Sequence, residues 1–153
     1  MATKYELLAD DTVQQDGRSL SRVRRLSDGL LGGYIETQDN LAQSGGCFLF
    51  EKSRAFGNSR IRDDAELYGM VYGEAVLGGN AKVFGEVFGQ ARVLDHAIVR
   101  GRVYDRALVK DSAEVYGQAY GRSVVEDHAK VYGQIYGTAK ASDHEVVFGA
   151  KSR

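Results

Sequence analysis

The 153-residue sequence contains no proline, although average usage of about 5% would give roughly seven or eight. It contains 19 glycines, so the lack of proline does not reflect a lack of turns. Proline has no backbone N–H group to donate to a neighbouring strand. A glycine-rich, proline-free chain therefore indicates many tight corners between strands whose N–H groups are all hydrogen-bonded.

The sequence also has only one cysteine, no long apolar run and no large excess of one charge. Cys47 is the only cysteine, so no internal disulfide can form, which fits a reducing compartment. No apolar run approaches the ~20 residues that span a bilayer, and the N-terminus shows no signal-peptide pattern. Twenty basic residues against 21 acidic ones argue against a protein that coats nucleic acid. We expect one cytoplasmic domain that neither spans a membrane nor binds nucleic acid.

What the sequence does contain is a repeat of sixteen residues. Segments that begin at residues 65, 81, 97, 113, 129 and 145 align without gaps. Each full copy alternates small or aliphatic residues with polar or aromatic ones, as residues 113–128 show. This spacing of two is typical of strands, whereas a helical solenoid needs apolar spacings of three and four. The odd-numbered residues are expected to face inward.

Three positions in each copy carry glycine or aspartate, residue types that tolerate the positive φ of a sharp bend. These expected corners are Gly69, Gly85, Gly101, Gly117, Gly133 and Gly149; Gly73, Gly89, Asp105, Gly121 and Gly137; and Gly79, Asp95, Asp111, Asp127 and Asp143. Three short sides per copy predict a triangular, all-β, single-stranded β-helix that rises about 4.8 Å per turn. Residues 47–64 form an eighteen-residue turn, so the later turns should have one shortened side.

The repeat divides the chain into two regions. Residues 1–46 do not follow it, and Asp16-Gly17 between strand-like segments predicts a β-hairpin. We interpret residues 1–46 as an N-terminal cap that covers the open strand edges of the helix. Residues 47–153 are then the β-helix, with one 18-residue turn, five 16-residue turns and a partial last turn.

The six-residue units resemble those of hexapeptide-repeat left-handed β-helix proteins, many of which are acyltransferases. Over nearly the whole chain the sequence is similar to uncharacterised hexapeptide-repeat-like proteins of bacteria and prophages. The similarity lies in Asp16-Gly17-Arg18, Leu31-Gly32-Gly33-Tyr34-Ile35-Glu36, Asn40-Leu41 and the Ala-x-Val-Tyr-Gly repeats. The resemblance implies a left-handed helix, which the residue pattern does not specify, and it implies little about function because fold does not determine chemistry.

Twelve of the fifteen aromatic residues fall into two outward columns. One column follows the first side and contains Phe50, Tyr68, Phe84, Tyr116, Tyr132 and Phe148, with Arg100 as its one interruption; the other contains Phe56, Tyr72, Phe88, Tyr104, Tyr120 and Tyr136. Together they predict an aromatic strip about 30 Å tall. The strip either stabilises the helix as a stacked ladder, binds a partner or another copy, or stacks nucleobases.

All three histidines occupy one outward column, each directly after a corner aspartate: His96, His128 and His144. A histidine base would deprotonate the acceptor in an acyltransferase of the hexapeptide type, and a His/Asp column could also hold a metal. The same column contains Asp64, Asn80 and Ser112, as an ordinary row of polar corner residues would. Stacked corner aspartates are unfavourable unless their carboxylates accept backbone N–H groups or bind cations.

These observations favour a non-enzymatic binding or scaffold protein, related to phage or prophage proteins, that works as a homo-oligomer or with a protein partner. The expected binding residues are Tyr68, Tyr72, Phe84, Phe88, Tyr104, Tyr116, Tyr120, Tyr132 and Tyr136. No cofactor and no metal are expected. The alternative is a CoA-dependent acyltransferase that acts as a trimer, with His96, His128 or His144 as the catalytic base.

Overall fold

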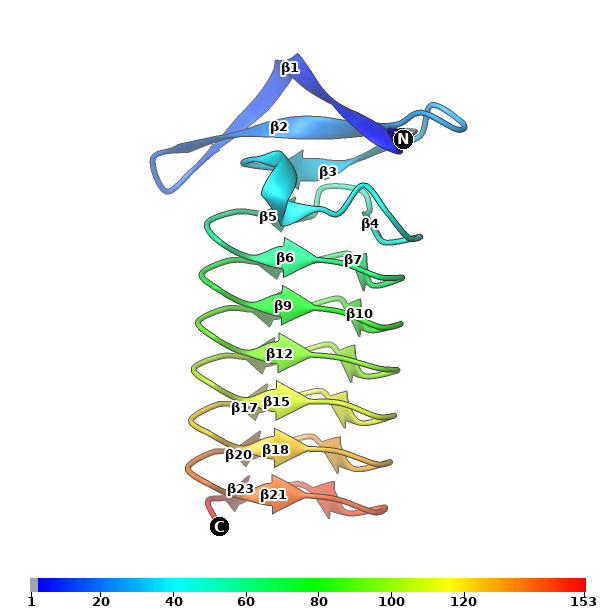
Figure 1. The fold of residues 1–153 in the computed structure, drawn as a ribbon. Helices are drawn as coiled ribbons and strands as arrows, with labels where there is room; N and C mark the ends of the chain where they lie inside the picture. Colours follow the sequence, from blue (N-terminus) through cyan, green and yellow to red (C-terminus); the bar gives the residue numbers. More distant parts are fainter. Residues whose placement is uncertain (1–2) are drawn as a thin grey trace.

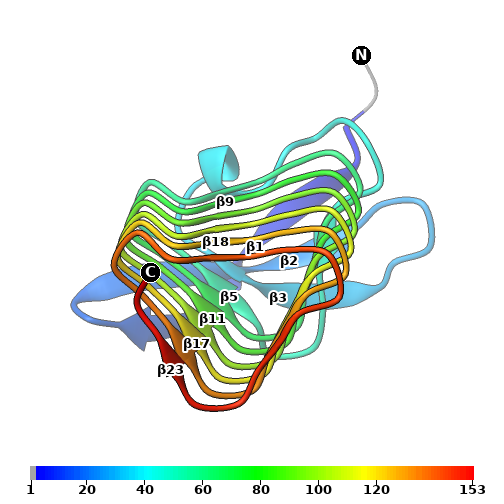
Figure 2. The same ribbon diagram turned by 90° about the horizontal axis from the view of Figure 1, so that it is seen from below.

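Residues 47–153 wind into coils of short strands that stack beneath an N-terminal hairpin, and Figure 1 shows this column from the side. The structure is a computed structural model that describes residues 3–153. Equivalent strands of successive coils pair in parallel and build three sheets. The view along the axis shows the three sides that enclose the core (Figure 2). The predicted all-β repeat architecture, with sixteen residues per coil, is confirmed; left-handedness stays a prediction.

The seven-stranded sheet takes one two-residue strand from each coil: β4 (Phe48–Leu49), β7 (Glu66–Leu67), β10 (Lys82–Val83), β13 (Ile98–Val99), β16 (Glu114–Val115), β19 (Lys130–Val131) and β22 (Val146–Val147). The six-stranded sheet contains β6 (Arg60–Ile61), β9 (Val76–Leu77), β12 (Arg92–Val93), β15 (Leu108–Val109), β18 (Val124–Val125) and β21 (Lys140–Ala141). In every one of these strands the second residue is buried. The odd-numbered aliphatic residues therefore fill the core, as the spacing of two predicts.

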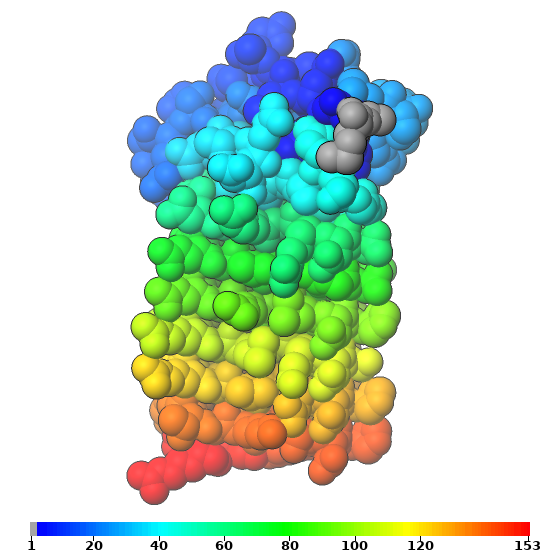
Figure 3. Space-filling model, in the orientation of Figure 1, coloured from blue at the N-terminus to red at the C-terminus, as the bar shows by residue number. Residues whose placement is uncertain are grey.

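The ten-stranded sheet joins the N-terminal region to the coils. It contains β1 (Tyr5–Gln15), β2 (Arg18–Arg25), β3 (Leu31–Ile35), β5 (Arg54–Ala55), β8 (Met70–Val71), β11 (Glu86–Val87), β14 (Arg102–Val103), β17 (Gln118–Ala119), β20 (Gln134–Ile135) and β23 (Ala150–Lys151). β1 and β2 are antiparallel and turn at Asp16-Gly17, and β3 pairs in parallel with β5. β3 thus covers the open edge of the first coil in this sheet, and the hairpin extends the sheet beyond β3. Figure 3 shows it as a wider layer above evenly stacked rows of side chains.

The strand register places the two extra residues of the first coil at a corner. Phe48 pairs with Glu66 eighteen residues later, whereas Arg54 pairs with Met70 only sixteen residues later. The two additional residues are therefore Glu51 and Lys52, between β4 and β5. The expectation of one shortened side is wrong in this respect, because later coils keep all three strands and tighten the corner between two of them.

The three corners use glycine for different reasons. The second and third corners have positive φ, for example 69° at Gly73 and 61° at Asp95, as predicted. The first-corner glycines from Gly69 onward do not have positive φ, so that part of the prediction is wrong. They are needed because the coils approach closely there: a Cβ atom on Gly101 would lie 1.9 Å from the carbonyl oxygen of Gly117.

The corner aspartates form a hydrogen-bonded ladder rather than a repulsive stack. The Asp127 carboxylate accepts the backbone N–H of Asp143 at 2.9 Å, and the Asp111 carboxylate accepts that of Asp127 at 3.1 Å. At the second corner the Asp105 carboxylate accepts the N–H of Gly121 at 3.0 Å. Each carboxylate thus satisfies a backbone donor one coil further on, which explains why aspartate replaces glycine at these bends.

Two buried polar side chains hold the cap together and attach it to the first coil. Asn40, in the 3₁₀ helix η1 (Gln38–Asn40), is fully buried and accepts the N–H groups of Glu36 and Thr37. Its amide group donates to the carbonyl oxygens of Gly57 and Ser59. The Tyr5 hydroxyl donates to the carbonyl oxygen of Leu41. These bonds connect the hairpin, η1 and the first coil into one unit.

Alkaline pH is expected to weaken this attachment through Tyr5. Burial raises the pKa of Tyr5 to about 12, so the unfolded chain releases this proton at a lower pH than the folded chain. The contribution of the protonated Tyr5 hydroxyl to the free energy of unfolding is complete below the ordinary pKa of 10. It is lost as pH rises through 12, a loss of about 2–3 kcal/mol. Denaturant unfolding at several pH values should show a flatter loss of stability for Tyr5→Phe between pH 10 and 12. Equal slopes for the two proteins would contradict this role.

Candidate functional site

The predicted aromatic columns are stacked ladders. In the second aromatic column (Phe56, Tyr72, Phe88, Tyr104, Tyr120, Tyr136) the rings follow one another without a break, with centroids 4.9–5.2 Å apart. The first aromatic column (Phe50, Tyr68, Phe84, Tyr116, Tyr132, Phe148) stacks with centroids 4.7–5.5 Å apart. Arg100 interrupts it and places its guanidinium 4.6 Å from the centroid of the Phe84 ring. The stacked-ladder reading of the sequence therefore describes the geometry well.

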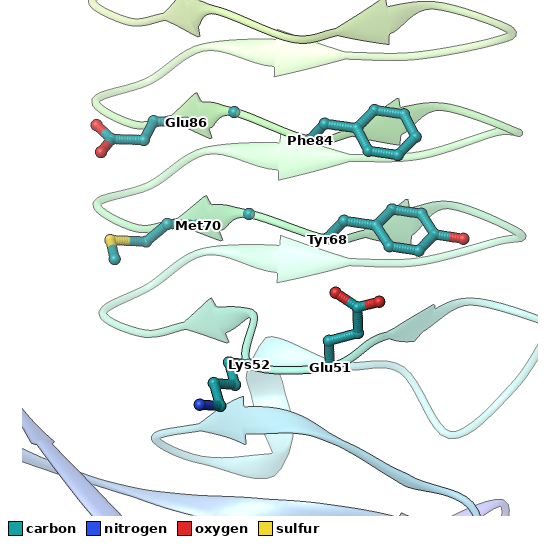
Figure 4. A pocket seen from close by; sticks show the side chains of 8 residues that line it. Glu51, Lys52, Tyr68, Met70, Phe84 and Glu86 are labelled. Atoms are coloured by element: carbon teal, nitrogen blue, oxygen red, sulfur yellow. The ribbon is translucent and has the colours of Figure 1, made fainter.

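The two columns cover neighbouring faces rather than one continuous strip. The Tyr68 hydroxyl donates to Glu66, so the rings of the first column lean over the seven-stranded sheet. The Tyr104 hydroxyl donates to Gln118, so the rings of the second column lean over the ten-stranded sheet. Figure 4 shows that Tyr68 and Phe84 point away from Met70 and Glu86. Each column therefore belongs to a different outer surface.

A shallow hollow lies between the columns, over the first-corner glycines. Its volume is about 710 Å³, and its lining residues are Glu51, Lys52, Tyr68, Gly69, Met70, Phe84, Gly85 and Glu86. The floor is backbone because Gly69 and Gly85 have no side chains. An open, backbone-floored hollow of this kind can take an extended group of a partner, but it does not enclose a small molecule.

The tyrosine hydroxyls are held as hydrogen-bond donors. The Glu66 carboxylate accepts the Tyr68 hydroxyl at 2.6 Å and raises the pKa of Tyr68 to about 12. Glu114 raises the pKa of Tyr116 in the same way, with a hydrogen bond of 2.8 Å. Burial raises the pKa values of Tyr72 and Tyr104. These bonds hold the rings in one orientation along the ladder.

The ladder geometry limits what the rings can bind. A nucleobase stacks on an exposed ring face, but inside a ladder each face is covered by the next ring. The columns therefore present ring edges to a partner, together with a free face at an end of each ladder. Ring edges suit the packing of another side-chain surface better than the stacking of bases.

The histidine column is arranged in the same way. The rings of His128 and His144 stack with centroids 5.1 Å apart, whereas Ser112 separates them from His96. Beside His96 is an open hollow of about 510 Å³ whose lining includes Asp64, Asn80 and Lys82. Within residues 3–153, no three His, Cys, Asp or Glu side chains come together as a metal site.

Three features of the surface and cap were not found from the sequence. Leu26 and Leu30 in the loop between β2 and β3, and Leu31 at the start of β3, are exposed; Val146 is exposed at the other end of the coils. Val146 carried a signal, because it stands where all earlier copies except that with Ile98 have glutamate or lysine. Lys4 donates to the thiol of Cys47 at 3.3 Å, and burial nevertheless raises the pKa of that thiol, which makes it a weak nucleophile.

No protein-family model matches the chain, and no match was found among the curated proteins. In residues 3–153, no helix is both long enough and apolar enough to cross a membrane.

Proposed function

We propose that this protein is a non-enzymatic β-helical binding or scaffold protein that acts through its aromatic-lined outer faces. The observation that carries the proposal is the presence of two stacked aromatic ladders along the coils. Phe56, at the top of the second column, is buried against Leu20 and Tyr34 of the cap, whereas the other rings of the two columns are half-buried or exposed. Such surfaces are characteristic of sites where proteins meet.

The rigidity of the rod supports this role. Every coil is hydrogen-bonded to the next along three sheets, and glutamate and glutamine side chains hold the tyrosine hydroxyls. A preorganised surface loses little conformational entropy when it binds. The partner is another copy of this chain or a second macromolecule. The resemblance to prophage proteins adds a phage accessory or host-interaction role, and the single unpaired cysteine favours the cytoplasm.

The Tyr116→Ser/Tyr120→Ser double variant tests the proposal. It removes one ring from each column, so self-association or partner capture is expected to fall at least about tenfold. The readouts are solution mass by light scattering and affinity capture, with circular dichroism to confirm that the coils persist.

The matched control is Leu108→Ser/Val124→Ser, which removes apolar surface from the six-stranded sheet, away from both ladders. Unchanged association in the tyrosine variant, or an equal loss in the control, would contradict the proposal. A rise in Tm with millimolar acetyl-CoA would favour the acyltransferase instead, with one of the three histidines as its base.

A further inference from the structure

The most exposed large apolar side chains gather on one side of the molecule. Seven side chains are at least 39% exposed: Leu26, Leu30, Leu31, Phe84, Tyr132, Val146 and Phe148. Phe84, Tyr132, Val146 and Phe148 lie on the seven-stranded sheet or in the column that leans over it. Leu26 and Leu30 lie in the loop between β2 and β3, which projects past the coils (Figures 1 and 2), and Leu31 is the first residue of β3; the three are called the loop leucines below.

This loop stands beside the top of the seven-stranded sheet. The guanidinium of Arg25, at the end of β2, lies 5.0 Å from the centroid of the Phe48 ring in β4. A Cβ atom on Gly32, in β3, would lie 2.5 Å from the carbonyl oxygen of Leu49. The seven-stranded sheet therefore has apolar groups at both ends, with Val146 and Phe148 at the bottom and the loop leucines at the top.

Between these ends the outward residues of the seven-stranded sheet alternate in charge, and positions equally far above and below the centre carry opposite charges. From top to bottom the first residues of the seven strands, here the charge column, are Phe48, Glu66, Lys82, Ile98, Glu114, Lys130 and Val146. Phe48 is buried, with the Arg25 guanidinium over its ring, whereas the other six side chains are half-buried or exposed. Ile98 lies at the centre. Above it the order is apolar, acidic, basic; below it the order is acidic, basic, apolar.

We propose that this face binds the same face of a second copy, related by a two-fold axis that runs parallel to the strands through Ile98. This inference rests on the proposed binding role and names its partner. The axis makes the two rods antiparallel. Each residue above Ile98 therefore faces the residue of the second copy that lies the same number of coils below Ile98. Lys82 then faces Glu114 of the second copy, and Glu66 faces Lys130. A parallel pair would instead oppose like charges.

The neighbouring columns are compatible with the same axis. In the first aromatic column Tyr68 faces Tyr132 of the second copy, and Phe84 faces Tyr116. In the histidine column Asp64 faces His128, which is favourable when the imidazole is protonated. Val146 and Phe148 come against the loop leucines, so the apolar ends are covered together. Arg100 lies near the axis and faces Arg100 of the second copy, so like charges meet at this position. Its guanidinium already lies over the Phe84 ring of its own chain.

Glu66 and Glu114 already accept the hydroxyls of Tyr68 and Tyr116, and each carboxylate keeps further acceptor capacity for a second copy. The ammonium of Lys82 forms no ion pair or hydrogen bond with any described residue. Lys130 has a partially exposed ion pair with Glu114 in its own chain at 3.4 Å, which a second copy could extend into a network. Six coils and three columns give a face about 30 Å by 15–20 Å. Two such faces bury roughly 1,000 Å² in total, the lower limit for a specific interface.

Charge reversal with rescue tests the inference. An acidic variant, Lys82→Glu/Lys130→Glu, and a basic variant, Glu66→Lys/Glu114→Lys, each oppose like charges in a homodimer. We expect each to raise the dimer Kd about 100-fold by sedimentation equilibrium, and we expect an equimolar mixture of the two to associate again. The mixture also reports folding, since a misfolded variant would not recover a partner.

The control is Arg92→Glu/Lys140→Glu on the six-stranded sheet, with the same change of charge and the same three-coil separation. It should dimerise like the unmodified protein. Arg100→Tyr should tighten the dimer at least about threefold, because it removes the like charge near the axis. A weaker or unchanged dimer would show that the axis lies elsewhere.

Three results overturn the inference and have different consequences for the proposed function. A monomeric unmodified protein at all accessible concentrations overturns the self-pairing and leaves a foreign partner for the aromatic faces. A dimer that persists in both charge variants shows that copies meet through another face. Failure of two folded variants to associate when mixed overturns the antiparallel arrangement.

Discussion

Replacing Gly101 with alanine is expected to destabilise the β-helix by about 3 kcal/mol or more. The new Cβ atom would lie 1.9 Å from the carbonyl oxygen of Gly117 and 2.5 Å from that of Tyr116. Both contacts are with backbone that is itself hydrogen-bonded to neighbouring coils, so neither atom can move without breaking the ladder. Denaturant unfolding would measure the loss, and a lowered midpoint with an unchanged m-value would assign it to the folded state.

Gly149→Ala is the matched control for this prediction. Gly149 occupies the same column of first-corner glycines, but a Cβ atom there meets nothing within 4 Å. We expect a change of no more than about 0.5 kcal/mol, or a small stabilisation from the lower entropy of the unfolded chain. If the two alanine variants lost equal stability, close approach between coils would not be the reason for glycine at this corner.

Replacing Asn40 with alanine is expected to cost about 3 kcal/mol and to detach the cap from the first coil. The substitution leaves the Thr37 N–H and the carbonyl oxygens of Gly57 and Ser59 without the Asn40 amide, whereas the Glu36 N–H keeps the carbonyl oxygen of Ala55. Hydrogen exchange should show faster exchange at Thr37 than deeper in the coils, because the bond from its N–H group to Asn40 is removed.

Asn58→Ala provides the comparison for Asn40. Asn58 is exposed at the next corner, so its removal should change the free energy of unfolding by no more than about 0.5 kcal/mol. A similar small effect at Asn40 would mean that water or a shift of η1 replaces its hydrogen bonds.

The aromatic positions illustrate how far the sequence predicts a candidate site. The even numbering of Tyr68 and Tyr104 in a chain with period-two alternation places both rings outside, and the period of sixteen stacks each on its equivalent one coil away. The direction in which each ring leans is not contained in that pattern. It depends on the hydroxyl partners: Glu66 lies two residues before Tyr68, and Gln118 lies one coil after Tyr104.

By itself, the sequence determined the period of the coils, the residues that fill the core and the positions of the corners. These follow from local properties, namely strand alternation, side-chain size and the turn preferences of glycine and aspartate. Tertiary structure alone decided why Gly101 must be glycine, what Asn40 connects and that Leu31 and Val146 lie at two ends of one face. Each of these depends on the distance between segments that only the stacking of coils and the docking of the cap bring together.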